Sequence, residues 1–177
     1  KLTEFAQLDG YILMKNSPSC GLERIKVYQK NGYPHQTRIS GVFARALKEQ
    51  NPLMPIEEEG RLHDPRLFEN FVLRVYAYHN FRKEVLIEPS LHKLIAFHSS
   101  YKYLLMAHNQ TSYKKLGRLL GQPHNALSLE EIIHNYLHEF MNAISKPANA
   151  KNHTNALLHM VGYLKRSIPS QARQHIV

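Results

Sequence analysis

The stretch "SLHKLIAFHSSYKYLL", residues 90–105, decides the fold class of this chain. Its first residue is a serine, which is favoured at the position that caps a helix N-terminus. Apolar side chains then recur at spacings of one, three and four: Leu91, Leu94, Ile95, Phe97, Tyr101, Leu104 and Leu105. This spacing places them on one face of an α-helix, so the stretch predicts an amphipathic helix with a buried stripe.

Similar signals predict further helices on both sides of this one. An aspartate followed by a proline begins a helix expected over residues 64–83. A Ser-Leu-Glu-Glu capping box begins another, expected over residues 128–145. Two more are expected over residues 111–120 and 150–167. Together they predict a helical domain over residues 63–177.

The first 62 residues have a different character. Short strands are expected over residues 10–14 and 25–28, an exposed loop over 29–40, a helix over 41–50, and a strand edge or extended connector over 53–59. This order is typical of the end of an α/β domain and not of a whole one. The predicted fold class is therefore mainly α, a helical bundle preceded by the terminal strands and helix of an α/β domain that covers residues 1–62.

Charge is distributed unevenly along the chain. Residues 1–88 hold 13 Lys/Arg and 11 Asp/Glu, whereas residues 89–177 hold 10 and 3. A cationic surplus indicates a polyanionic partner, with nucleic acid the first expectation and an anionic membrane surface the second. Solubility is the alternative explanation of the net charge of +9. No run of about 18 apolar residues occurs, so no membrane-spanning helix is expected.

Cys20, the single cysteine, lies in the turn-forming sequence "NSPSCG", residues 16–21. A thiol in such a turn can serve as a nucleophile, a redox sensor or a metal ligand, and an unreactive free thiol is the alternative. Cysteines that serve packing usually lie in apolar runs, so we expect this thiol to be exposed. A lone cysteine forms no internal disulfide, which predicts a cytoplasmic location.

Two stretches of the helical part, residues 98–118 and 151–166, combine basic and aromatic residues. Cations neutralise phosphates, and exposed tyrosines or histidines stack on unpaired bases. The candidate RNA-binding residues are Lys102, Tyr103, His108, Lys114, Lys115, Arg118, Lys151, His153, Lys165 and Arg166. The alternative is that the tyrosines belong to the core and the lysines to a solvated face. His134 and His138 have a spacing that suits a shared metal, but no third ligand is signalled.

Several of these stretches resemble known families. "LMKNSPSCG", residues 13–21, resembles the signature of TudS-like thiouracil desulfidase domains. "SGVFARAL", residues 40–47, and "PIEEEGRL", residues 55–62, are similar to the last helix and strand of that domain.

The helical part resembles the YbgA-type domain, which is found fused behind desulfidase domains. The matching stretches are "ENFVLRVYAYHNFR" at 69–82, "LIAFHSSYKYLLMAHNQTSYKKLGRLL" at 94–120 and "HTNALLHMVGYLKRSI" at 153–168. The resemblance thus covers nearly the whole chain.

The resemblance implies functions for two residues of the turn. Cys20 would be one of the cysteine ligands of a [4Fe–4S] cluster, and Ser17 would be a catalytic residue that contacts the substrate or donates a proton. Fused proteins of this kind remove sulfur from 4-thiouridine in tRNA, so tRNA is the expected partner. The family's other cluster cysteines and its general-base glutamate have no counterpart here. We therefore expect a C-terminal portion of a longer enzyme that alone holds no cluster and is inactive.

Two alternative functions remain open at this point. The chain could be a non-enzymatic helical module for binding or regulation. It could also belong to a desulfidase for free thiouracil, in which the helical domain only stabilises the enzyme. The cationic surplus favours tRNA over a free base, because a free base needs no broad cationic surface. The oligomeric state is not indicated by the sequence.

Overall fold

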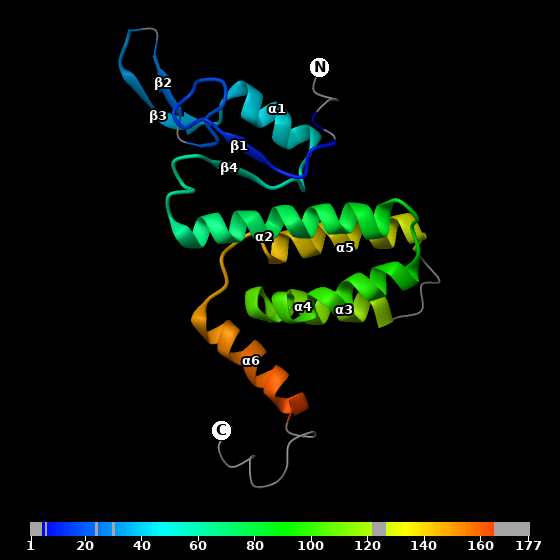
Figure 1. Ribbon diagram of the computed structural model, residues 1–177. Helices are drawn as coiled ribbons and strands as arrows, with labels where there is room; N and C mark the ends of the chain where they lie inside the picture. Colours follow the sequence, from blue (N-terminus) through cyan, green and yellow to red (C-terminus); the bar gives the residue numbers. More distant parts are fainter. Residues whose placement is uncertain (1–4, 6, 24, 30, 122–126, 165–177) are drawn as a thin grey trace. The chain divides into compact units, whose positions relative to one another are not determined.

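The computed structural model describes residue 5 and residues 7–23, 25–29, 31–121 and 127–164 (Figure 1). The chain forms two compact units, Lys1–Lys83 and Glu84–Val177, called the first and the second unit below. Helix α2 (Pro65–Phe81) therefore belongs to the first unit, although the sequence grouped it with the helical part. The mainly α fold class is confirmed.

In the described residues of the first unit, four strands form two small sheets. β1 (Tyr11–Leu13) pairs in parallel with β4 (Ile56–Glu58). β2 (Ile25–Tyr28) pairs antiparallel with β3 (Pro34–Ile39). The strands expected near residues 10–14, 25–28 and 53–59 are thus confirmed.

The loop expected over residues 29–40 is wrong for residues 34–39, because β3 pairs with β2 to form a hairpin. The backbone N–H of Gln29 donates to the carbonyl of Tyr33 at 2.8 Å. Gly32 has a φ of 81°, a left-handed conformation that glycine adopts without strain. An Asn-Gly pair is a hairpin signal as well as a loop signal, and the polar sequence of β3 gave no alternation to distinguish them.

The core of the first unit lies between β1, β4 and helix α1 (Val42–Gln50). It is formed by the buried residues Leu13, Leu22, Ala44, Leu47, Met54 and Ile56. Asp64 caps α2 as expected, its carboxylate accepting from the backbone N–H of Arg66 at 2.8 Å. One π-helical segment, η2 (Arg82–Leu86), follows α2.

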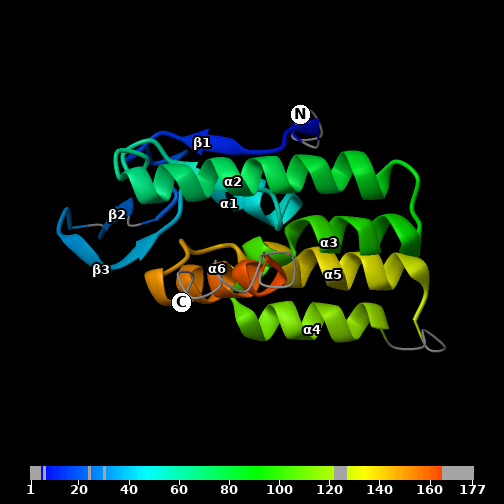
Figure 2. The ribbon, with the colours of Figure 1, turned by 60° about the horizontal axis from the view of Figure 1, so that its bottom comes forward.

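The described residues of the second unit form four α-helices: α3 (Leu91–His108), α4 (Gln110–Gly121), α5 (Leu129–Ala143) and α6 (Ala150–Leu164) (Figure 2). α3 is central, because it contacts each of the other three. The expected serine caps are confirmed: Ser90 Oγ accepts from the backbone N–H of Lys93, and Ser128 forms a capping box with Glu131.

An aromatic cluster fills the core between α3 and α5. The Phe140 ring lies edge-on to Phe97, with centroids 5.1 Å apart, and to Tyr101 at 5.5 Å. Tyr136, which is fully buried, stacks on Phe140 at 6.0 Å. Ile95 was expected in the buried stripe, but it is 42% exposed, so this part of the expectation is wrong. Leu94, Phe97 and Leu105 of the expected stripe are fully buried and form the inner face of α3.

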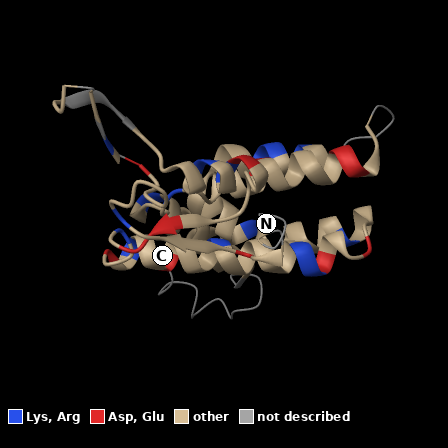
Figure 3. Ribbon diagram, turned by 90° about the horizontal axis from the view of Figure 1, so that it is seen from above, with Lys and Arg blue, Asp and Glu red and all other residues tan. Residues whose placement is uncertain are grey.

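Charge segregates by helix in the second unit (Figure 3). α3, α4 and α6 carry lysine or arginine and no aspartate or glutamate, whereas α5 carries three glutamates and no lysine or arginine. The surface shared by α3, α4 and α6 is therefore cationic. In the described parts of the chain, no helix combines the length and the apolar character needed to cross a bilayer.

Candidate functional sites: a cysteine turn and a tyrosine pocket

The turn that carries Cys20 is held by hydrogen bonds within the turn itself. Ser17 Oγ accepts from the backbone N–H groups of Ser19 at 3.3 Å and Cys20 at 3.1 Å. The carbonyl of Ser17 accepts from the backbone N–H of Gly21 at 2.8 Å. Asn16, which precedes the turn, has a φ of 61°, in the left-handed region that asparagine tolerates. Ser17 therefore fixes the turn with both its side chain and its main chain.

The same turn also caps helix α1. The carbonyl of Ser19 accepts from the backbone N–H groups of Phe43 at 3.0 Å and Ala44 at 3.2 Å. Gly41, the N-cap residue, has no side chain to do this, and its N–H donates to the carbonyl of Gly21 at 2.8 Å. A Cβ at position 41 would lie 2.2 Å from the Ser19 oxygen, so only glycine allows this approach.

Cys20 is half-buried and packs against the core of the first unit. The expectation of an exposed thiol is therefore wrong, because the turn folds back onto α1 instead of projecting into solvent. The catalytic role expected for Ser17 stays a prediction. Its hydroxyl oxygen accepts two backbone hydrogen bonds, and as a hydroxyl it keeps a proton to donate.

A polar cavity of about 180 Å³ is lined by residues on both sides of the turn: Lys15, Asn16, Leu22, Glu23, Glu58 and Arg61. Glu58 is only 7% exposed, and its Oε1 accepts from the backbone N–H of Leu22 at 2.7 Å. Glu58 was not predicted from the sequence as a site residue. The signal in the sequence was the run of glutamates at residues 57–59, within an expected strand. A glutamate that a strand buries needs a hydrogen-bond partner, which marks it as a candidate site residue.

The residues of this chain do not make a complete iron–sulfur site. Such clusters are held by several cysteine thiolates, and Cys20 is the single cysteine of the chain. Within the described residues, no group of three or more His, Cys, Asp or Glu side chains could hold a metal. Cys20 fits one ligand position, and the remaining ligands of any cluster would have to come from polypeptide other than these residues.

In the second unit, helices α3, α4 and α6 form a pocket of about 300 Å³, called the tyrosine pocket below. Its lining residues are Lys102, Tyr103, Met106, Gln110, Tyr113, Lys114, Asn155, His159 and Tyr163. Lys102 Nζ lies over the Tyr103 ring at 4.7 Å from its centroid and over the Tyr163 ring at 5.1 Å. The pocket brings together three of the predicted RNA-binding residues, Lys102, Tyr103 and Lys114.

Two important members of the tyrosine pocket, Asn155 and Tyr163, were not predicted from the sequence. Both lie within the basic and aromatic stretch 151–166, which was the only signal that could have found them. Their approach to Lys102 depends on the packing of α6 against α3, which the sequence does not show.

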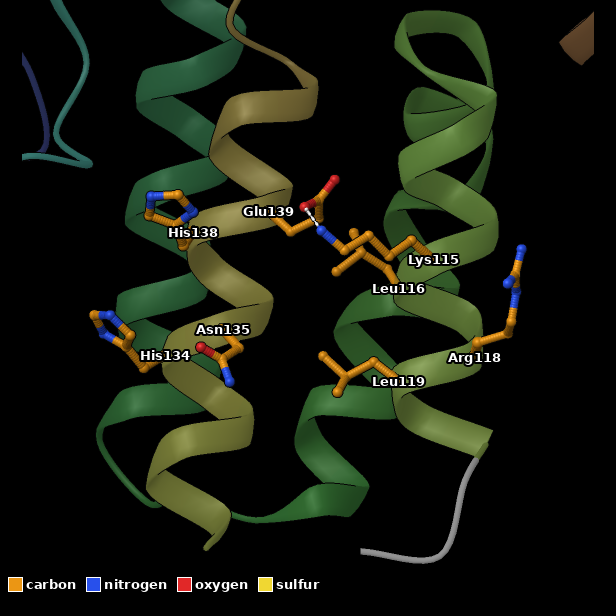
Figure 4. A pocket seen from close by; sticks show the side chains of 8 residues that line it. All are labelled: Lys115, Leu116, Arg118, Leu119, His134, Asn135, His138 and Glu139. Carbon is orange, nitrogen blue, oxygen red and sulfur yellow. Dashed lines mark hydrogen bonds and ion pairs between the residues drawn. The ribbon is translucent and has the colours of Figure 1, made fainter. Parts of the chain in front are cut away.

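Lys115 and Arg118, two further candidates, line a larger pocket of about 670 Å³ between α4 and α5 (Figure 4). Lys115 Nζ forms an ion pair with the Glu139 carboxylate, and this hydrogen bond lowers the pKa of Glu139. Lys115 therefore neutralises a carboxylate of its own chain, whereas Arg118 extends outward from α4 (Figure 4). His134 and His138 lie one turn apart on α5 and line the same pocket.

The remaining candidates differ in their surroundings. His108 Nδ1 lies 2.8 Å from the carbonyl oxygen of Lys146, and burial lowers the pKa of this histidine, although the same hydrogen bond opposes the shift. His108 thus ties the end of α3 to the segment before α6. Lys151 and His153 are exposed on the first turns of α6 and do not line the tyrosine pocket. Lys165 and Arg166 lie outside the described residues.

Comparison with known proteins finds relatives of both parts of the chain. Residues 1–59 match the family described as 2-thiouracil desulfurase, and residues 102–177 match a family described as a protein of unknown function, DUF1722. The uncharacterized protein YbgA of Escherichia coli (strain K12) is 33% identical over 113 residues. The chain is thus similar to the 2-thiouracil desulfurase family over its first 59 residues and to YbgA and the DUF1722 family over its helical part.

The match to YbgA covers 63% of this chain and 66% of that protein, slightly less than two thirds of its length. No solved structure matches the chain. The desulfurase match includes the Cys20 turn, α1 and Glu58, and the match of the YbgA-type domain begins at Lys102 in the tyrosine pocket. Each candidate site therefore lies in a segment that its family shares.

Proposed function

We propose that this chain is part of an iron–sulfur desulfidase that removes sulfur from 4-thiouridine in tRNA, with the second unit binding the tRNA. The observation that carries the proposal is the tyrosine pocket, where cations and tyrosines meet on three helices that have no carboxylate. This surface belongs to the same chain as a desulfurase-family segment.

The chemistry of the second unit suits RNA. Lysine and arginine neutralise phosphates and release bound counterions, which supplies much of the affinity for nucleic acid. Exposed aromatic rings stack on unpaired bases without demanding a particular sequence. A base inside a folded RNA has to be unstacked before an enzyme can act on it, and this costs free energy. A domain that grips the RNA apart from the reacting base offsets this cost.

In this proposal the first unit supplies one thiolate, from Cys20, to a [4Fe–4S] cluster. The Ser17 hydroxyl, the carbonyl of Ser19 and Gly41 fix the position of Cys20 through the main-chain contacts described above. Because the residues of this chain do not complete a cluster, we assign no reaction step to the chain alone. Its own contribution is a rigid turn that holds one ligand in place.

A desulfidase for free thiouracil is the second candidate. It is favoured by the description of the matched family, which names 2-thiouracil and not an RNA. In that case the cationic surface of the second unit would have no substrate to bind. Binding of tRNA therefore distinguishes the two candidates.

A titration with tRNA tests the RNA-binding part. We expect the affinity of the chain to fall by about fiftyfold between about 50 mM and about 200 mM salt, as expected for a few phosphate contacts. A variant with Lys102→Glu, Lys114→Glu and Arg118→Glu should lose binding. The matched control changes the exposed Lys26, Lys48 and Lys83 to glutamate, with the same change in net charge. No binding by the wild-type chain at low salt would refute this part.

The desulfidase part is tested in the complete protein with tRNA that contains 4-thiouridine. Cys20→Ser should abolish sulfide release and the cluster absorbance. Ser19→Ala is the matched control, because the exposed Ser19 acts through its main-chain carbonyl, which alanine keeps. Full sulfide release by Cys20→Ser would remove Cys20 from the ligand set.

A further inference from the structure

We propose that the tyrosine pocket holds one unpaired nucleotide of an RNA, with the base against Tyr163 and Asn155 and the phosphate at Lys102 and Lys114. This inference rests on the proposed function and deepens it, because it names the unit of RNA that the second unit reads. Three features of the pocket carry it: its charge, its aromatic rings and an unpartnered amide.

The charge of the pocket selects an anion. Two lysines and a histidine line it, and its lining contains no carboxylate. Lys102 Nζ lies over the rings of both Tyr103 and Tyr163, so the aromatic faces that could attract a cationic ligand already hold a cation of the chain. A second cation would be repelled there, whereas a phosphate would meet the ammonium groups of Lys102 and Lys114.

The aromatic rings differ in how freely they can meet a base. The Tyr113 ring stacks on His98, with an interplanar angle of 2°, and Tyr103 packs against the buried Met106. These two rings are therefore fixed by their own neighbours. Tyr163 is 61% exposed, and it is the ring that a base could cover.

Asn155 adds a polar contact for the base. It lines the pocket, and its Nδ2 is buried without a hydrogen-bond partner among the described residues. A buried donor without an acceptor is costly, so such groups usually have a partner. A nucleobase would supply the acceptor, because each of the four bases presents a carbonyl oxygen or a ring nitrogen at its edge.

The size of the pocket limits the ligand to a single nucleotide. Its volume of about 300 Å³ is at the lower end of the range for small-molecule pockets. A base that enters it has to be unpaired, because pairing would occupy the edge that Asn155 reads. The expected substrate feature is therefore an unpaired nucleotide in a loop or at a free end of the RNA.

Binding of oligonucleotides tests the proposal. The full chain is titrated at low salt with fluorescent oligouridylate and with an abasic oligonucleotide of the same length, about eight nucleotides, which single-strand binding sites accommodate. We expect oligouridylate to bind about fiftyfold more tightly, the combined effect of one stacking contact and about one hydrogen bond. Asn155→Leu should reduce this difference by about fivefold, the part that the hydrogen bond contributes. Its fold is checked by thermal melting, and leucine removes an unpartnered amide at similar volume.

Tyr163→Ala should weaken oligouridylate binding by about tenfold, the effect of one lost stacking contact. Tyr76→Ala is the matched control, because Tyr76 is 66% exposed on α2 and lies outside the pocket. Equal binding of the two oligonucleotides by the wild-type chain, or unchanged binding by Tyr163→Ala, would overturn the proposal.

Titration with tRNA separates this proposal from the proposed function. If the wild-type chain and Tyr163→Ala bind tRNA equally, the pocket assignment is wrong and the tRNA-binding function stands. If the chain prefers oligouridylate but does not bind tRNA, the pocket assignment stands and the tRNA-binding function is wrong.

Discussion

Main-chain groups and the Ser17 hydroxyl hold the Cys20 turn in place, whereas side chains from three helices form the tyrosine pocket. In the turn, the carbonyl of Ser19 caps α1 and a glycine at position 41 permits the close approach. In the pocket, the Lys102 ammonium group lies over two tyrosine rings that come from α3 and α6. The two sites therefore depend on different properties of the sequence.

This difference decides which substitutions damage each site. A site held mainly by main-chain groups tolerates most side-chain substitutions. It does not tolerate a new Cβ atom at a position where two backbone segments are in contact. A site formed by side chains on packed helices depends on the core that sets the helix positions. Substitutions in the aromatic core of the second unit should thus disturb the pocket, and substitutions at Gly41 should disturb the turn.

The largest expected effect is that of Phe140→Ala in the second unit. Phe140 is fully buried among Phe97, Tyr101 and Tyr136, so its removal leaves a cavity in the aromatic core. We expect the free energy of unfolding of this unit to fall by about 4 kcal/mol, measured by urea denaturation. Phe68→Ala is the control, because Phe68 is 50% exposed. Equal losses in the two variants would contradict the aromatic core.

Gly41→Ala should destabilise the first unit by about 2 kcal/mol, because the new Cβ would meet the carbonyl of Ser19 at 2.2 Å. The Cys20 turn has to move away from α1, so the thiol should also react faster with a thiol reagent. Gly162→Ala is the matched control. Among the described residues, no atom outside the backbone of α6 lies within 4 Å of a Cβ at position 162, and alanine should stabilise that helix by up to about 1 kcal/mol. Unchanged stability and thiol reactivity in Gly41→Ala would contradict the main-chain account of the turn.

The sequence predicted the helices well because their signals are local. The serine caps and the capping box act within one helical turn, and the structure shows each of them where it was expected. Strand β3 was missed because its evidence is not local. Its sequence is polar, and only pairing with β2 makes it a strand.

The candidate sites were predicted less completely for the same reason. Lys102, Tyr103 and Lys114 stood out by residue type alone, and the structure brings them together. Asn155 joins them only through the packing of α6 on α3. His108 was predicted to bind RNA. Its ring forms a hydrogen bond with the carbonyl of Lys146, and residue type alone does not reveal this partner.

The smallest expected effect concerns pH and the second unit. His98 is half-buried, its Nδ1 lies 3.0 Å from the Tyr136 hydroxyl, and burial lowers its pKa below the ordinary value of 6.5. The unfolded chain therefore binds a proton at a higher pH than the folded chain does. The contribution of neutral His98 to the stability of the second unit is therefore fully present above about pH 6.5, and it is lost as the pH falls below that value.

Urea unfolding at about pH 7.5 and about pH 5.5 measures this effect. The second unit should be less stable at the lower pH, and His98→Gln should reduce the difference. Part of it should remain, because burial also lowers the pKa of His108, so that residue acts in the same direction. His134→Gln, at an exposed position on α5, is the control. If His98→Gln kept the whole pH dependence of the unfolding free energy, burial would not lower the pKa of His98. The packing of His98 on Tyr113, which lines the tyrosine pocket, would then be less tight than the contacts indicate.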